Sequence, residues 1–270
     1  MDYDYSLESL KASLDSAGVR TGDTLFIHVS LGRLGRLKEG ATIEDMNRVL
    51  YRALTEAVGP KGNVLVPTYT YSIGRKQVYD VMNSPSIIGP FSEYFRLLPG
   101  SERSMDPMLA VSGQGPLVSS LFKELPKTCY GQDCVYERLR EIGAKICTLG
   151  VGLYFATFRH HIEEMAQVPF RAKKKMRGIV RLDGLDLEQE WIYFAAPFLR
   201  NCQPNGVPLE KKIRAEGKCQ TASVGRSELV VIGAKEYFEF GLKELARDPW
   251  FTALGPPATA PEMAEKMDHP

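Results

Sequence analysis

The chain has 270 residues, enough for one large domain or two small ones, and 44% of them are hydrophobic and 25% charged. These proportions are typical of an ordinary globular protein. The net charge of +1 gives no reason to expect a nucleic acid or an anionic membrane as partner. No apolar run approaches the ~20 residues that a membrane-spanning helix needs.

The first residues and the cysteines both predict a cytoplasmic protein. The N-terminus begins MDYDYS, which is acidic and lacks the basic and apolar regions of a signal peptide. The five cysteines stand at irregular spacing and form no CxxC pair. We therefore expect reduced thiols, with neither a disulfide framework nor a metal site.

Helices and short apolar strands alternate in the first part of the chain. Amphipathic patterns predict helices over residues 6–17 and 43–58. Short apolar runs predict strands over residues 24–29 and 63–67. This order of elements favours an α/β fold, in which helices cover a mostly parallel sheet.

The middle of the chain is less regular. Residues 71–90 show no hydrophobic periodicity, which predicts a long loop. Long loops in compact domains often have a function, and this one could be a lid or an interface in a homodimer. A short helix follows over residues 89–99, with Ser92 as a candidate cap. Further patterns predict strands at 109–112 and 145–151 and a helix at 135–142.

An antiparallel hairpin is predicted in the C-terminal half. Residues 173–195 alternate basic and apolar positions around Asp183 and Gly184, which suit a tight turn. The lysine run 173–175 is either a solvated face or a contact to a phosphate of a cofactor. Further patterns predict helices at 209–216 and 234–247 and a strand at 228–232. We expect one domain over residues 1–257 and a loose, Pro- and Ala-rich tail over 258–270.

The segment TFRHHIEE at residues 157–164 contains candidate catalytic residues. Thr157 is a candidate N-cap, and Pro169 ends the helix near residue 167. On such a helix His160 and Glu163 lie three residues apart on one face, and His161 and Glu164 repeat the spacing. A carboxylate that fixes the imidazole tautomer and raises its basicity makes a general base. The alternative is an ordinary helix start that carries two surface histidines.

Candidate binding groups follow the predicted strands. In parallel sheets, ligands bind beyond the carboxyl ends of the strands, where this chain has residues 28–35, 67–70 and 103–106. These loops offer hydroxyls, arginines and glycines, and glycine allows backbone to approach a phosphate closely. Neither the dinucleotide fingerprint GxGxxG nor the P-loop motif is present. Arg103 could bind a ligand or hold Asp106, and Asp106 could form an Asx turn or bind a substrate amine.

Six segments in this order resemble the aminoglycoside 3-N-acetyltransferase family of antibiotic N-acetyltransferases. They are GDTLFIHVSLGRLG at 22–35, VLVPTYT at 64–70, GPFSEYFRLLPG at 89–100, RSMDP at 103–107, LGV at 149–151 and the Thr157, His160 and Glu163 pattern; VPFR at 168–171 is also similar. The resemblance implies a three-layer α/β/α fold and direct transfer of an acetyl group from acetyl-CoA to an amine.

The resemblance also implies residue roles. His160 is the base and Glu163 orients it, while Thr70 or the loop that contains Ser30 stabilises the developing oxyanion. The expected acetyl-CoA site comprises His28, Ser30, Leu31, Gly32, Arg33, Leu34, Gly35, Arg103 and Ser104. The expected acceptor site comprises Tyr69, Asp106, Glu164 and Arg171.

One departure from the family bears on the acceptor. Many antibiotic-inactivating members have histidine where this chain has Asp106. Aminoglycosides are polycations, yet this chain is nearly neutral and its segment 171–177 is basic. These features favour a biosynthetic enzyme that acetylates an amino sugar, a sugar nucleotide or another small amine. The alternatives are an aminoglycoside 3-N-acetyltransferase of the resistance type, a CoA thioesterase, and a non-catalytic CoA-binding protein.

Overall fold

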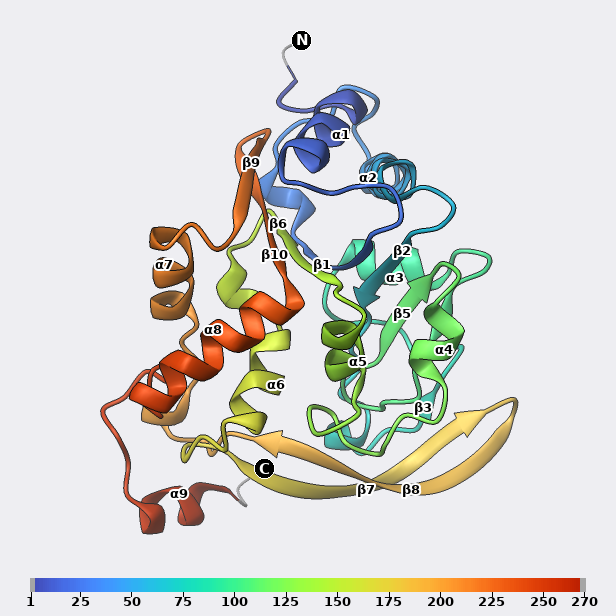
Figure 1. The fold of residues 1–270 in the computed structure, drawn as a ribbon. Helices are drawn as coiled ribbons and strands as arrows, with labels where there is room; N and C mark the ends of the chain where they lie inside the picture. The colour runs from blue at the N-terminus through green and yellow to red at the C-terminus, as the bar shows by residue number, and fades with distance from the viewer. Residues whose placement is uncertain (1–2, 268–270) are drawn as a thin grey trace.

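The computed structural model describes residues 3–267 and is built around a seven-stranded mixed sheet (Figure 1). The strand order is β4-β5-β2-β1-β6-β10-β9. The central strands β2, β1 and β6 are parallel, and the strands outside them are antiparallel to their neighbours. In chain order the strands are β1 (Thr24–Val29), β2 (Asn63–Pro67), β4 (Glu102–Arg103), β5 (Val111–Gln114), β6 (Lys145–Leu149), β9 (Gln220–Val224) and β10 (Ser227–Gly233).

Helices cover both faces of this sheet, which gives three layers (Figure 1). Side chains alternate between the faces of a strand, so Leu25 and Ile27 enter one core and Phe26 enters the other. The first core is closed by α1 (Leu7–Ser16), α2 (Ile43–Val58) and α3 (Pro90–Arg96). The second is closed by α4 (Val118–Phe122), α5 (Val135–Glu141), α6 (Phe158–Met165), α7 (Val207–Ala215) and α8 (Ala234–Arg247).

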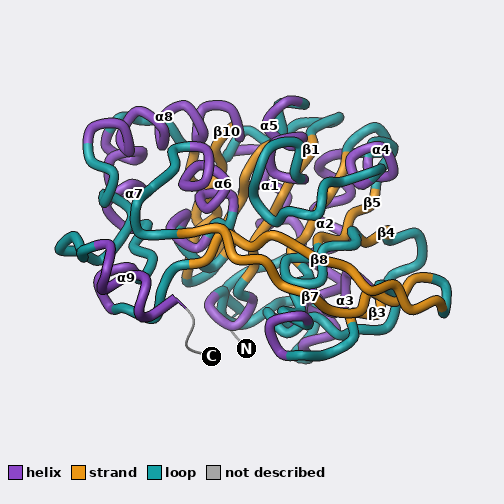
Figure 2. Tube along the Cα trace, turned by 90° about the horizontal axis from the view of Figure 1, so that it is seen from below, coloured by secondary structure: helices purple, strands orange, loops and turns teal. Residues whose placement is uncertain are grey.

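The predicted hairpin forms a separate sheet with β3 (Tyr79–Asp80). Its strands β7 (Ala172–Leu182) and β8 (Leu185–Ala195) pair along their whole length. Asp183 and Gly184 both have positive φ, as a two-residue hairpin turn requires. Seen from below, the hairpin crosses the molecule beneath the main sheet (Figure 2).

The α/β class and the three layers are confirmed, but three details differ from expectation. The parallel part of the sheet is limited to its three central strands, because β5 and β10 return antiparallel on either side. The N-cap of α3 is Gly89 rather than Ser92. The strand expected from residue 109 begins at Val111.

The expectation of a loose tail is wrong for residues 260–267, which form α9 (Ala260–Met267). Met263 packs against the core, and the Phe198 N–H donates to the Lys266 carbonyl at 3.2 Å. Residues 268–270 of the expected tail lie outside the described part of the chain. Within residues 3–267, no helix combines the length and apolarity needed to cross a membrane.

Candidate functional site

His160 and Glu163 meet on α6 as their spacing predicts. The His160 Nδ1 lies 2.7 Å from the Glu163 Oε2. The Glu163 side chain is fully buried, whereas 16% of the His160 side chain is exposed. Because an ionised carboxylate only accepts, His160 carries its proton on Nδ1 and keeps a lone pair on Nε2. This is the tautomer that a general base needs.

Two buried arginines also bind Glu163. Arg159 contacts its Oε1, and the Arg171 Nε lies 2.9 Å from Oε2. Burial alone would raise the pKa of Glu163, but the charges of Arg159 and Arg171 and the hydrogen bond from His160 outweigh it and hold that pKa well below its usual range.

The same surroundings keep His160 neutral. Burial, and then the charge of Arg171, lower the pKa of His160 to about 3 against the opposing charge of Glu163. Contrary to the sequence-based expectation, Glu163 therefore fixes the tautomer without making His160 more basic than a free imidazole.

A pocket of about 520 Å³ opens at the carboxyl ends of β1 and β2, where the fold predicts a ligand. Four of the predicted site residues line it, namely His28, Ser30, Arg33 and Tyr69. Thr157 lines it as well, one turn before His160 on the chain. The other lining residues are Val29, Pro67, Tyr71, Ile88, Ser92, Val151 and Phe155.

His28 ties the end of β1 to the start of α6. Its Nε2 accepts from the Thr157 N–H at 3.3 Å and lies 3.1 Å from the Thr157 Oγ1. Thr157 stands at the N-cap position, but its hydroxyl makes no capping hydrogen bond, contrary to expectation. Burial lowers the pKa of His28 to about 3, so this imidazole is also neutral.

The loops after β1 and β6 approach each other closely beside this pocket. Gly150 has a φ of +77°, and a Cβ there would lie 2.3 Å from the Ser30 carbonyl oxygen. Only glycine fits this position without moving the backbone. Leu31 and Leu34 are buried in the core, and a Cβ on Gly35 would meet the Asp4 side chain. Of the predicted loop, His28, Ser30 and Arg33 therefore reach the pocket.

Arg103 and Ser104 hold the polypeptide rather than line the pocket. The Arg103 guanidinium donates to the carbonyls of Thr68 and Ser84, each at 2.6 Å. The Ser104 hydroxyl accepts from the Val111 N–H at 2.9 Å. The structure therefore does not bring these two residues together with His28 and Ser30.

Thr70 and Asp106 also bind backbone. The Thr70 hydroxyl donates to the Pro107 carbonyl at 2.9 Å. The Asp106 carboxylate accepts from the N–H groups of Met108 and Leu109 at 2.8 and 2.9 Å, the Asx turn considered above. Burial raises the pKa of Asp106.

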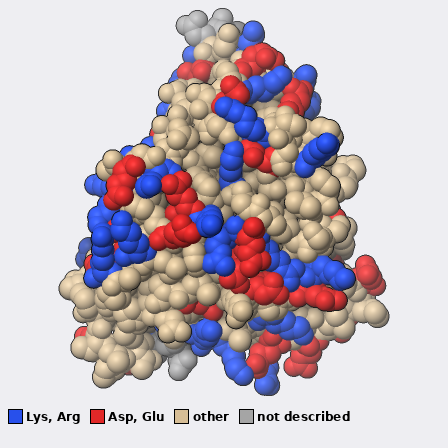
Figure 3. Space-filling model, in the orientation of Figure 1, with Lys and Arg blue, Asp and Glu red and all other residues tan. Residues whose placement is uncertain are grey.

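The basic strand β7 is matched by acidic groups. Lys175 and Arg177 lie 3.0 and 3.1 Å from Glu190 on β8, and the Lys173 Nζ lies 3.4 Å from the buried Glu164. Figure 3 likewise shows positive and negative side chains interspersed over one face of the molecule. The charges on β7 therefore do not indicate an anion site.

Sequence reasoning missed two neighbours of the dyad. Arg159 stands four residues before Glu163, a spacing that predicts an ion pair and could have been noticed. The ring of Tyr130 lies 5.4 Å from that of His160, but its position in a distant loop gives no local signal.

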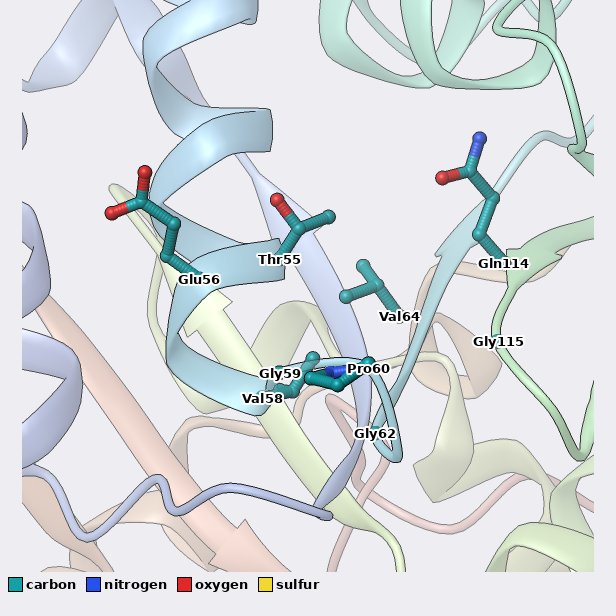
Figure 4. Close-up of a pocket in the computed structure, with 9 residues that line it drawn as sticks. All are labelled: Thr55, Glu56, Val58, Gly59, Pro60, Gly62, Val64, Gln114 and Gly115. Atoms are coloured by element: carbon teal, nitrogen blue, oxygen red, sulfur yellow. The ribbon is translucent and has the colours of Figure 1, made fainter.

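No predicted site residue lines a second pocket, of about 500 Å³, at the opposite end of β2 (Figure 4). It lies between the end of α2 and Gln114. Among residues 3–267, no group of three or more His, Cys, Asp or Glu side chains is placed to hold a metal ion.

A family model described as aminoglycoside 3-N-acetyltransferase matches residues 26–246. The chain belongs to this family. A relative from Salmonella sp, aminoglycoside N(3)-acetyltransferase IV, is 27% identical over 259 residues, which cover 92% of this chain and 90% of the relative.

Solved structures of this acetyltransferase family share the fold. The apoenzyme of aminoglycoside acetyltransferase AAC(3)-IVa aligns with a TM-score of 0.81 at 24% identity, covering 99% of this chain and 98% of that one. AAC-VIa bound to sisomicin aligns with a TM-score of 0.77 at 25% identity, covering 90% and 98%. The complex titled "AAC-IIIb binary with CoASH" aligns with a TM-score of 0.75 at 23% identity, covering 93% and 99%.

The family resemblance, the CoA-dependent N-acetyltransferase class and acetyl-CoA as the donor are thereby confirmed. The preference for a biosynthetic amine is not supported, because the named relatives are aminoglycoside N(3)-acetyltransferases. That preference rested on Asp106, on the nearly neutral net charge and on the basic segment 171–177. In that segment, Lys173, Lys175 and Arg177 are paired with carboxylates.

Proposed function

We propose that this acetyltransferase transfers the acetyl group of acetyl-CoA to the 3-amino group of an aminoglycoside, with His160 as general base. One observation carries the assignment of the base. The His160 Nδ1 is held 2.7 Å from a buried, ionised Glu163, so the Nε2 lone pair is available for a proton. The dyad follows Thr157, which lines the pocket at the carboxyl ends of the central strands.

The reaction requires one nucleophile and no covalent enzyme intermediate. The unprotonated amine nitrogen attacks the thioester carbonyl carbon, and His160 takes the proton that this nitrogen loses. The C–S bond then breaks, the acetamide forms, and the CoA thiolate leaves and gains a proton. His160 is neutral when the amine arrives because its pKa lies far below 7.

The pocket that contains His28, Ser30 and Thr157 fits the arm of acetyl-CoA. It is large enough for a pantetheine chain, and it lies where parallel sheets bind ligands. The Arg33 side chain is exposed at this pocket, where a guanidinium suits a CoA phosphate. We assign the oxyanion contact to Ser30 rather than Thr70, because the Thr70 hydroxyl already donates to Pro107.

Glu164 is a candidate for binding the acceptor. It is buried, its Oε1 lies 3.4 Å from the Nζ of the exposed Lys173, and its Oε2 has no hydrogen-bond partner within residues 3–267. Burial raises the pKa of Glu164 against the opposing charge of Lys173. An ammonium group of an aminoglycoside would add a second cation at this carboxylate.

Free-thiol release from acetyl-CoA tests the proposal. We expect release to require an aminoglycoside such as sisomicin, and His160→Ala to reduce it by a factor of about 10² to 10⁴, the usual contribution of a general base. Equal release without any amine would instead indicate a thioesterase. CoA binding without turnover of any aminoglycoside would indicate a binding protein. In cells, expression of the wild type, but not of His160→Ala, should raise the inhibitory concentration of the substrate aminoglycoside.

A further inference from the structure

We propose that Arg159 and Arg171 are positioning residues that let Glu163 orient His160 while preventing His160 from being protonated before the acceptor amine reacts. This inference rests on the proposed function in that it takes His160 as the proton acceptor. It goes further in giving the two arginines an electrostatic role in turnover, beyond that of structural ion pairs.

The geometry makes the arginines part of the dyad. The Arg171 Nε and the His160 Nδ1 share one oxygen of Glu163, at 2.9 and 2.7 Å, and Arg159 takes the other oxygen. Only 4% of each arginine side chain is exposed, so water screens these charges little. The Glu163 carboxylate is therefore paired with two cations in addition to its contact with the neutral His160.

Arg171 is fixed from more than one side. Its Nη1 donates to the Phe194 carbonyl on β8 at 2.9 Å. The neighbouring Phe170 is fully buried and packs against Trp250, with ring centroids 5.4 Å apart. Arg171 is thus held against Glu163 by the base of the hairpin and, through Phe170, by the segment that follows α8.

The charge balance around His160 opposes its protonation. An isolated histidine and carboxylate attract when the histidine is protonated, which stabilises the imidazolium. Here a protonated His160 would be a third cation beside Glu163. The ring of Tyr130 beside His160 carries no charge, and within residues 3–267 the charged groups that act on the pKa of His160 are Arg171, Glu163 and Arg159. Burial is the main cause of the lowered pKa of His160, and the charges of Arg171 and Arg159 lower it further, in agreement with this balance.

This arrangement suits an enzyme whose acceptor is a base stronger than imidazole. A histidine with an ordinary pKa would be partly protonated near pH 6 and would lose its lone pair. With His160 neutral, the pH dependence of turnover follows the ionisation of the acceptor amine alone. The proton taken up during the reaction is also expelled readily to solvent, because three cations then surround one carboxylate.

An NMR titration of the enzyme without ligands tests this role. The chain has four histidines, so His160→Ala assigns the His160 ring signal by difference. In the wild type we expect no titration of His160 above about pH 5. In Arg171→Gln the midpoint should rise by about 1 to 3 pH units, the usual effect of one charge at this distance. Arg171→Lys keeps the charge and should restore the wild-type behaviour.

The matched control is Arg177→Gln. Arg177 lies on β7, the strand that begins directly after Arg171, but it is paired with Glu190. Its loss should therefore leave the midpoint of the His160 titration unchanged. If Arg171→Gln does not fold, Arg159→Gln tests the same charge balance. In Arg171→Gln the fall of kcat with acid should become steeper below the NMR midpoint, because His160 then loses its lone pair in addition to the ionisation of the amine. A purely structural role would lower kcat equally at every pH.

A wild-type His160 midpoint between about pH 6 and 7 would overturn the inference. So would a midpoint that does not change in Arg171→Gln or in Arg159→Gln. The titration needs no acceptor, so it gives its answer even if no aminoglycoside is acetylated. Failure of the proposed function and failure of this inference are therefore distinguished.

Discussion

Replacing Glu163 by glutamine should destabilise the protein strongly, although the side chain keeps its shape. Glu163 is fully buried between Arg159, His160 and Arg171. The substitution removes the carboxylate and leaves two buried guanidinium groups without a counter-charge. Removing one partner of a buried ion pair costs about 3–5 kcal/mol, and here one carboxylate serves both arginines.

This magnitude can be measured as a shift in melting temperature. For a protein of this size, 1 kcal/mol corresponds to about 2–4 °C, so we expect Glu163→Gln to lower the Tm by about 6–20 °C. Glu190→Gln is the matched control, because that carboxylate is partly exposed and binds the exposed Lys175 and Arg177. Exposed pairs contribute about 0–1 kcal/mol, so the control should shift the Tm by no more than about 4 °C.

The refuting result is equal, small shifts in the two variants. Such a result would mean that the arginines find other partners or reach water when Glu163 loses its charge. The double variant Glu163→Gln with Arg171→Met offers a second check. It removes one unpaired cation together with the carboxylate, so it should recover part of the lost stability.

Three further results are expected. Acid should destabilise the enzyme between about pH 6.5 and pH 3, because His28 and His160 have folded-state pKa values near 3 and in this range bind protons only when the protein is unfolded. Each histidine should lower the free energy of unfolding by about 1.4 kcal/mol for each pH unit, as measured by denaturant unfolding at a series of pH values. Replacing either histidine by phenylalanine should remove its share of this slope. His28→Phe should lower stability by about 1–3 kcal/mol and reduce kcat, because the partly buried Thr157 N–H loses its acceptor and the start of α6 is released. Equal activity in both proteins would contradict this link. Arg33→Ala should raise the KM for acetyl-CoA about 10-fold without changing the KM for the acceptor. The control is Arg36→Ala, which removes an exposed arginine beside Asp4 and should change neither KM.

Features that depend on neighbouring residues could be predicted from the sequence. Burial alternates along strands and repeats along helices, so the central strands and the helices over residues 43–58 and 234–247 could be read from periodicity. The turn at Asp183 and Gly184 follows from the backbone angles those residues tolerate. The contact between His160 and Glu163 follows from their spacing on a helix, and its catalytic interpretation came from the family resemblance.

Hydrogen bonds and ion pairs between distant segments became visible only in the folded chain. Arg103 and Thr70 stand in a suitable loop, but their donors are taken by carbonyls that no local pattern predicts. The antiparallel pairing of β5 with β2 joins segments that are far apart in the chain, so no local pattern predicts its direction. Arg171 reaches Glu163 because the chain after α6 folds back towards it, and the charge of Arg171 adds to burial in lowering the pKa of His160. Charge interactions act through space, so sequence spacing revealed the pair but not its electrostatic environment.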